Sequence, residues 1–353
     1  MQINIYSRDF ATLLDTPFDW TVESYDWSIY GGPTIASLSA TDSEYRWDAA
    51  KLLRCPIEIL DDNGSPVWWG FVQAATIPQG SLGVGISLDS MFNAVAVTYA
   101  NMPAGATSPS GQNTTAWALA NESIAEYGQK EFIESMSDGT AAAAEARRNR
   151  ILAEYRYPNA IVAAFGGDRI KLELRGWWDV LSWRYYAQPG TAETATLNQV
   201  AAMVAVFSPI LSGAHLATSS GLATNSFRDG QTNARSQIEE LLKLGTSAGG
   251  RLSAMVTRVR AVRVDALPPA STPDLRLRED GKLENLADLV LDTARLDLAV
   301  GHWATLKSAP TVVGNFSTIH PFLIESASWR NGTASYRPVG QRDVFSVGKY
   351  GGY

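Results

Sequence analysis

The chain has 353 residues, of which 45% are hydrophobic and 18% are charged. This balance excludes a mainly disordered protein and is typical of a folded chain of two or three domains. The net charge of −7 argues against a protein that grips nucleic acid, because such binding depends on neutralising phosphates with Lys and Arg. The longest apolar stretches fall far short of the ~20 residues that a membrane-spanning helix needs, and nothing at the N-terminus is typical of a secretion signal.

Cysteine and histidine are too sparse to predict a metal centre. Cys55 is the one cysteine, so it cannot form an internal disulfide, and we expect it to be a small buried side chain. His215, His302 and His320 are scattered, and none has sequence neighbours that would make a proton relay. We therefore predict no metal ion, no cofactor and no enzymatic activity.

The first third of the chain predicts β-structure. Residues 57–60 and 67–72 flank a polar segment that contains Asn63 and Gly64, which is typical of a hairpin turn because glycine adopts positive φ cheaply. Residues 114–157 are richer in Ala, Glu and Arg, and they predict two helices that are joined near residues 137–139.

The second half alternates strands and helices. Strands are expected over residues 169–174 and 251–265, the latter with a β-bulge where its alternation changes phase. Helices are expected over residues 197–207 and 233–244, and Thr232 or Asn233 would cap the second before Gly245 ends it. The chain closes on a β-hairpin over residues 322–338, with a type I′ turn at Asn331-Gly332.

Residues 86–99 align without a gap with residues 172–185. Only the pairs Leu88/Leu174 and Tyr99/Tyr185 are identical, but most other positions match in character. One interpretation is a duplicated β-module with the 114–157 helices inserted between the copies. The other is that any two amphipathic strands in an aromatic-rich chain align this well.

Two sequence motifs suggest chemistry, and both are better explained as turns. Residues 245–249 match Gly-x-Ser-x-Gly, but the hydrolase motif needs a strand before the serine and a helix after it, and the predicted order here is the reverse. Asp61, Asn63 and Gly64 resemble a calcium loop, but Val72 stands where a glutamate ligand is required.

Carbohydrate binding or glycoside cleavage is the alternative from another functional class, because the chain is rich in tryptophan. Trp68-Trp69 and Trp177-Trp178 are adjacent pairs, and adjacent residues in a strand point to opposite faces, so at most one tryptophan of each pair could lie on a sugar-binding surface. The adjacent acids Asp61-Asp62 and Glu239-Glu240 are expected in a turn and on a helix, facing solvent. We therefore predict packing in the core or between modules for Trp68, Trp69, Phe71, Trp177, Trp178, Trp183, Tyr99 and Tyr185.

Four arginines form the one dense basic run in the β part of the chain: Arg251, Arg258, Arg260 and Arg263. On one strand face they would suit an acidic surface of a neighbouring subunit or of another protein. Ordinary solvation is the alternative. We predict an assembly interface, which Glu substitutions at Arg258 and Arg260 should impair without unfolding the monomer.

Several segments occur in an order that points to a known family. They are the hairpin strand Val67-Trp68-Trp69-Gly70-Phe71-Val72, the helix start Asn121-Glu122-Ser123-Ile124-Ala125-Glu126-Tyr127-Gly128, the helix end at residues 152–158, the segments 301–306 and 309–312, and the closing 322–329 strand. Together they resemble the baseplate-hub or tail-tip hub family of tailed bacteriophages. The resemblance spans most of the chain, and Ser-Ile-x-x-Tyr-Gly between two β-modules is its most suggestive part.

The resemblance implies a structural virion protein at the tail tip, made in the host cytoplasm, without enzymatic activity. It implies an α+β, mainly β fold with duplicated tube-type β-barrel or sandwich modules and inserted helices, and a homotrimer whose six modules meet a sixfold tail. Its partners would be the distal tail ring, tail tube, and fibre or spike proteins. DNA would meet it only in transit, host attachment would belong to other proteins, and the chain would not insert into a membrane. A hexameric distal-tail ring protein is the alternative within the same class.

This interpretation predicts five regions. They are a first β-module (1–112), a helical insertion (113–158), the first part of a second β-module (159–195), a helix-strand accessory domain (196–268) and a C-terminal β region that completes the second module (269–353).

Overall fold

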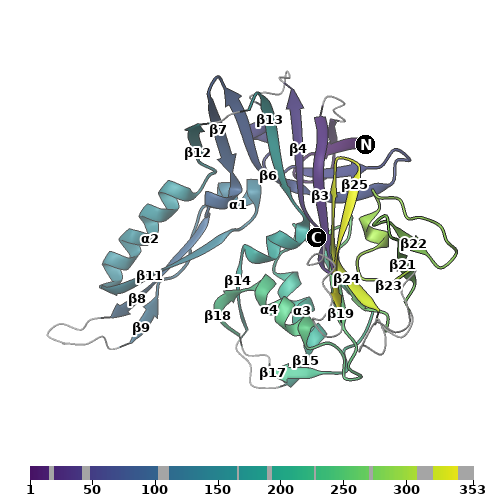
Figure 1. The fold of residues 1–353 in the computed structure, drawn as a ribbon. Coiled ribbons are helices and arrows are strands. Elements are labelled where there is room, and N and C mark those ends of the chain that lie inside the picture. Colours follow the sequence, from purple (N-terminus) through teal and green to yellow (C-terminus); the bar gives the residue numbers. More distant parts are fainter. Residues whose placement is uncertain are drawn as a thin grey trace, which may run out of the picture.

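The computed structural model describes residues 1–15, 20–41, 48–101, 111–164, 167–188, 193–225, 228–269, 273–307 and 321–340 (Figure 1). These residues confirm the predicted α+β, mainly β class. Their strands form several sheets, and within this part of the chain no sheet closes into a barrel. No helix in the described residues is both long and apolar enough to cross a membrane.

An antiparallel sheet dominates the molecule and joins distant parts of the sequence. Its strands in spatial order are β2 (Leu13–Asp15), β1 (Gln2–Tyr6), β5 (Pro56–Leu60), β6 (Pro66–Gln79), β13 (Arg169–Arg175), β4 (Tyr30–Thr41), β3 (Trp20–Ser28), β24 (Phe322–Arg330) and β25 (Thr333–Gly340). The yellow C-terminal hairpin therefore lies beside the purple N-terminal strands (Figure 1).

Smaller groups of strands extend this sheet. β7 (Leu82–Ser87) and β12 (Ala160–Ala164) continue from the second half of β6. β19 (Leu252–Val256) runs parallel to the start of β4 and leads to β20 (Ala261–Ala266) and β16 (Gly213–Leu216). On β24 lies β23 (Trp303–Leu306), followed by β21 (Leu275–Leu277) and β22 (Leu283–Asn285).

The two copies of the sequence repeat flank the same strand. Ala75 of β6 pairs with Ile86 of β7 on one side and with Leu172 of β13 on the other, which are aligned positions of the repeat. Both copies then continue into a 3₁₀ helix, Leu88–Ser90 or Trp177–Ser182. The aligned segments thus lie in equivalent register in one sheet, and Trp177 and Trp178 lie in a 3₁₀ helix rather than in the expected strand.

The 114–157 segment is only partly helical, contrary to prediction. Its helices are α1 (Asn121–Tyr127) and α2 (Ala141–Tyr155), while β11 (Glu131–Gly139) lies between them and runs parallel to β8 (Ala94–Asn101). Two short strands, β9 (Gln112–Thr114) and β10 (Ala118–Leu119), also pair with β8, and α2 packs on this sheet. In Figure 1 the unit projects to the left of the main sheet.

Tertiary pairing explains why the first predicted helix stops early. β8 offers β11 a parallel ladder of backbone hydrogen bonds over residues 131–136, and Phe132 of β11 stacks on Phe92 with 4.6 Å between ring centroids. These contacts outweigh the modest helix propensity of the segment.

The remaining helices and turns follow the sequence closely. α3 (Thr196–Ala205) and α4 (Ala234–Lys243) match the predicted ranges, and the Asn233 side chain accepts the Ser236 N–H as the α4 cap. Gly245 has φ of 72° beyond the end of α4, which confirms it as the stop. Two short two-stranded sheets lie around these helices, β14 (Tyr185–Gln188) with β18 (Arg228–Asn233) and β15 (Glu193–Ala195) with β17 (Ala223–Asn225).

Both predicted hairpins are confirmed, and a third replaces the predicted bulge. Asn331 and Gly332 have φ of 47° and 87°, as a type I′ turn requires. The chain over residues 251–265 does not form one bulged strand, because it turns back at residues 257–260 to pair β19 with β20.

A large aromatic cluster forms the core beneath the main sheet. Trp68, Phe71, Trp177, Trp178 and Trp183 are all at most 2% exposed. Phe71 lies 5.0 Å from the Trp177 ring and 5.6 Å from the Trp183 ring. Of the other three aromatics predicted to pack, Trp69 and Tyr99 are buried and Tyr185 is half-buried.

Glycine allows β13 and β4 to approach each other closely beside this cluster. A Cβ atom on Gly176 would lie 1.8 Å from the Pro33 carbonyl oxygen, and the Gly176 N–H donates to Thr34 O at 2.6 Å. The start of β4 is thereby held directly against the turn that carries Trp177 and Trp178.

Candidate functional site

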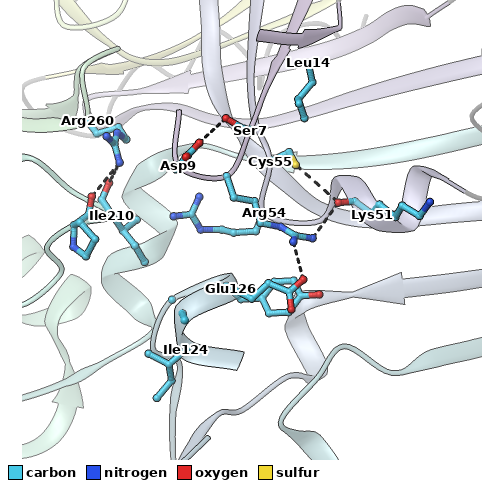
Figure 2. Close-up of a pocket in the computed structure, with 15 residues that line it drawn as sticks. Ser7, Asp9, Leu14, Lys51, Arg54, Cys55, Ile124, Glu126, Ile210 and Arg260 are labelled. Carbon is cyan, nitrogen blue, oxygen red and sulfur yellow. Dashed lines mark hydrogen bonds and ion pairs between the residues drawn. The ribbon is translucent and has the colours of Figure 1, made fainter. Parts of the chain in front are cut away.

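A pocket of about 840 Å³ opens where four separate parts of the chain meet (Figure 2). Its walls come from the loop after β1, the 3₁₀ helix η1 (Asp48–Leu52) with the residues that follow it, α1, and the loop 209–210 with the adjoining β19–β20 turn. Six charged side chains line it: Arg8, Asp9, Lys51, Arg54, Glu126 and Arg260. The apolar walls include Leu14, Ile124 and Ile210.

Arg54 is the unusual member of this set. The residue is only 4% exposed, has φ of 68° and is anchored by its N–H to Val72 O at 2.9 Å. Its guanidinium stacks 4.8 Å from the Trp177 ring and 5.7 Å from the Phe71 ring. The Nε and Nη1 atoms are buried, and no atom of the described residues accepts a hydrogen bond from either.

Arg8, in contrast, is fully engaged. It donates from Nε to Leu53 O at 2.9 Å and from Nη2 to Lys51 O at 3.0 Å, and its Nη1 lies 2.6 Å from Glu126 Oε1. These bonds tie the first loop to η1 and α1, so Arg8 builds one wall of the pocket.

Arg260 closes the opposite wall. Its Nη1 donates to the carbonyl oxygens of Pro209 and Ile210, each at 3.0 Å, and the guanidinium lies 3.9 Å from the centre of the Phe10 ring. The residue adopts φ of 62° in the β19–β20 turn, which directs it toward the pocket rather than along a strand.

The two carboxylates of the pocket are held by other groups. Asp9 accepts from Ser7 Oγ at 2.5 Å and from the Ala11 N–H at 3.0 Å, and these bonds lower the pKa of Asp9. Glu126 is paired with Arg8. Neither carboxylate neutralises Arg54.

Burial, followed by the charges of Arg260 and Arg8, lowers the pKa of Arg54 to about 9. The guanidinium therefore remains protonated at neutral pH. A protonated, desolvated guanidinium with unused donors is suited to bind an oxyanion, because the planar fork matches two oxygens at once.

The four arginines predicted as an assembly interface do not share one strand face. Arg258 lies in the β19–β20 turn and forms a two-pronged ion pair with Glu58, in which Nη2 to Oε2 measures 2.7 Å. Arg260 lies in the same turn, Arg263 on β20 pairs with Asp265 at 2.8 Å, and Arg251 precedes β19. The expected continuous basic face is therefore wrong, since the chain turns between these residues.

His302 has a partner that the sequence did not reveal. Its Nδ1 lies 2.5 Å from Asp274 Oδ2, across 28 residues of sequence, so the predicted isolation of His302 is corrected. His320 lies outside the described residues. Within the part of the chain that the structure describes, no three potential ligands gather as a metal site would require.

Residues 245–249 and 61–65 are turns, as predicted. α4 precedes the Gly-x-Ser-x-Gly sequence and β19 follows it, the reverse of the hydrolase order. Asp61 Oδ1 accepts the backbone N–H groups of Asn63 and Ser65 at 2.9 and 2.8 Å. That carboxylate therefore serves the hairpin turn.

The tryptophan pairs that prompted the carbohydrate hypothesis do not form an exposed platform. Trp68 and Trp69 of β6 are 0% and 8% exposed, and Trp177 and Trp178 are each 2% exposed. Trp69 Nε1 donates to Val256 O at 2.8 Å, which fixes its ring between β6 and β19.

Comparisons with known proteins give a likeness of shape and none of sequence. No protein-family model matches the sequence, and no curated protein matches it. The crystal structure of the prophage MuSo2 43 kDa tail protein from Shewanella oneidensis is similar over 96% of this chain and 96% of that chain, with a TM-score of 0.41 and 8% sequence identity.

The sequence did not single out Arg54 or the pocket. The pocket is built from residues near positions 8, 54, 126 and 260, which only the fold brings together. A weak indication was available at Arg54 itself, a charged residue between Leu53 and Cys55 in an otherwise apolar stretch before a strand.

Proposed function

We propose that this chain is a structural protein of a phage tail, and within the tail a subunit of the hub ring at its tip. The segments that carry the sequence resemblance support the proposal. The prophage tail protein described above belongs by name to the same broad class, and the proposal does not depend on it.

The observation that carries an assembly role is the open edge of the main sheet at β12. Among the described residues β12 pairs only with β7, so its other edge has free backbone donors and acceptors. Ile161 and Val162 are adjacent and point to opposite faces, yet they are 64% and 62% exposed. A strand of this kind is a template for pairing with another chain.

We propose that a second copy of this chain occupies that edge in a closed ring. Strand addition would hydrogen-bond the free edge and bury apolar side chains on both faces, and closure of the ring would leave no β12 edge unpaired. The resemblance to tail hubs favours three copies. The acidic net charge suits a ring through which DNA passes without binding.

The mass of the native particle tests the assembly. Three copies of the 38.2 kDa chain weigh about 115 kDa, so mass photometry should give this value and averaged electron micrographs should show threefold symmetry. A monomer would contradict the ring, and a hexamer would favour the distal-tail ring alternative.

A matched pair of variants connects the mass to β12. Ile161→Lys with Val162→Lys should reduce the particle to the monomer mass, because charges on both faces of an edge strand oppose pairing. Leu289→Lys is the control, since Leu289 is also 64% exposed but lies outside β12. Loss of the ring in both variants, or in neither, would contradict pairing through β12.

We also propose that the chain has no hydrolytic activity on peptidoglycan or other bacterial polysaccharides. The buried tryptophans and the structural role of Asp61 support this. Release of reducing sugar above a heat-inactivated sample, abolished by one Asp or Glu substitution, would overturn it.

A further inference from the structure

We infer that the Arg54 pocket is a binding site for an oxyanion, a phosphate or carboxylate group held by the Arg54 guanidinium. The inference goes beyond the proposed tail function and holds whether or not the chain forms a ring. It rests on the geometry of the pocket and on the unused donors of one buried cation.

The first argument is the unsatisfied state of Arg54. Buried polar groups in proteins almost always have hydrogen-bond partners, and an ionised group without one is strongly unfavourable. The Nε and Nη1 donors of Arg54 are buried without an acceptor in the described residues, and ring stacking on Trp177 and Phe71 supplies no acceptor oxygen. Arg54 also lines the pocket, so a small shift of its side chain toward an oxyanion there would give one of these donors an acceptor.

The second argument is the charge around Arg54. Arg8, Lys51 and Arg260 line the same pocket, and its two carboxylates, Asp9 and Glu126, are bonded to Ser7 and Arg8 rather than to Arg54. Arg8 and Arg260 disfavour the charged form of Arg54, so an added anion would relieve repulsion as well as bind. The site is thus electrostatically prepared for negative charge.

The third argument is the way in which the fold places Arg54. Residue 54 is held at positive φ, an uncommon conformation for a residue other than glycine, and its N–H is bonded to β6. Strain of this kind persists only where the surroundings impose it and is frequent at ligand sites. The pocket that Arg54 lines has space for a group much larger than a water molecule.

The test is thermal unfolding of the full chain in sodium phosphate, sodium acetate and sodium chloride at equal ionic strength and pH 7. Phosphate or acetate should raise Tm saturably above chloride, because binding to the folded state at ten times the dissociation constant favours folding about 11-fold. The more effective oxyanion identifies phosphate or carboxylate as the natural group. Equal curves in all three salts would overturn the inference.

Arg54→Met removes the proposed ligand-binding group while keeping an apolar stem on Trp177. It should abolish the oxyanion-specific rise, whereas Arg150→Met, at an exposed arginine of α2, should retain it. An unchanged rise in Arg54→Met would overturn the assignment.

A charge swap at the edge of the pocket tests the location without altering the core. Leu14 lines the pocket and is 52% exposed. Leu14→Lys should bind the oxyanion at least about threefold more tightly than Leu14→Glu, because the added charges act at short range. The same swap at Leu289 should have no such effect. Equal oxyanion dependence in both Leu14 variants would place the anion elsewhere and refute the pocket.

Discussion

Gly176 offers a sharp test of how the aromatic core is held. In Gly176→Ala the new Cβ would lie 1.8 Å from Pro33 O, so the start of β4 must move by about 1.6 Å to reach the 3.4 Å of ordinary contact. The backbone dihedrals at Gly176, φ −67° and ψ 157°, suit alanine. Any destabilisation therefore comes from the steric clash and not from backbone strain.

The magnitude follows from two losses and one gain. Overpacking against backbone lowers the free energy of unfolding by about 1–3 kcal/mol. Weakening the bond from Gly176 N–H to Thr34 O, 2.6 Å in the structure, removes about 1 kcal/mol. Replacing glycine restricts the unfolded chain and returns about 0.4–1 kcal/mol. The expected net loss is about 1–3.6 kcal/mol.

Gly85→Ala is the matched control. Gly85 also lies in a strand of the main sheet, but its added Cβ would meet only Ile161 O, at 3.8 Å. We expect this variant to unfold within about 0.5 kcal/mol of the parent chain or to be slightly more stable. Urea unfolding followed by tryptophan fluorescence, at one protein concentration, measures both. Equal midpoints for the two variants would refute the account of the β4–β13 contact.

Three further predictions concern buried or paired groups. The side chain of Asn93 is fully buried, and it donates from Nδ2 to Gly128 O at 2.8 Å and accepts the Lys130 N–H at Oδ1 at 2.7 Å. Asn93→Leu should therefore lower the free energy of unfolding, measured by urea titration, by about 2–4 kcal/mol. A loss under 1 kcal/mol would contradict this prediction. Arg258→Glu should lower Tm even in the monomer, because it places a second carboxylate beside Glu58 where the arginine formed an ion pair. An unchanged Tm would restore the original expectation of an effect on assembly alone. Burial raises the pKa of the Cys55 thiol above its ordinary value, so the folded state keeps a proton that the unfolded state loses at high pH. The free energy of unfolding of the parent chain relative to Cys55→Ala should therefore fall between pH 7 and pH 10, and a rise over this range would contradict the prediction.

The sequence predicted well those features of the fold that depend on a few neighbouring residues. The Asn331-Gly332 turn, the Asn233 cap and the Gly245 stop each depend on the φ preference or hydrogen-bonding capacity of one or two residues. Such features form with whatever partners the rest of the chain provides.

Features that depend on distant partners were predicted poorly. Phe132 and Ile133 were assigned to a helix, but they pair with β8, whose position the sequence does not reveal. The Arg54 pocket needs four segments that span more than 200 residues, and Asp274 reaches His302 across 28. Contacts of this kind follow from topology rather than from periodicity, and a single sequence gives no measure of which distant residues meet.

The pairing of β3 with β24 has a consequence for the newly made chain. Ser28 lies opposite Ser326, 298 residues later in the sequence, and Tyr25 donates its hydroxyl to Ala294 O at 2.6 Å. At a translation rate of about 5–20 residues per second, β3 waits about 15–60 s for its neighbour after leaving the ribosome. During that interval one side of an aromatic strand is open to other nascent chains. Chaperone dependence and sensitivity to the concentration of nascent chains should therefore be properties of this topology, and weaker induction at constant temperature should increase the yield of native protein.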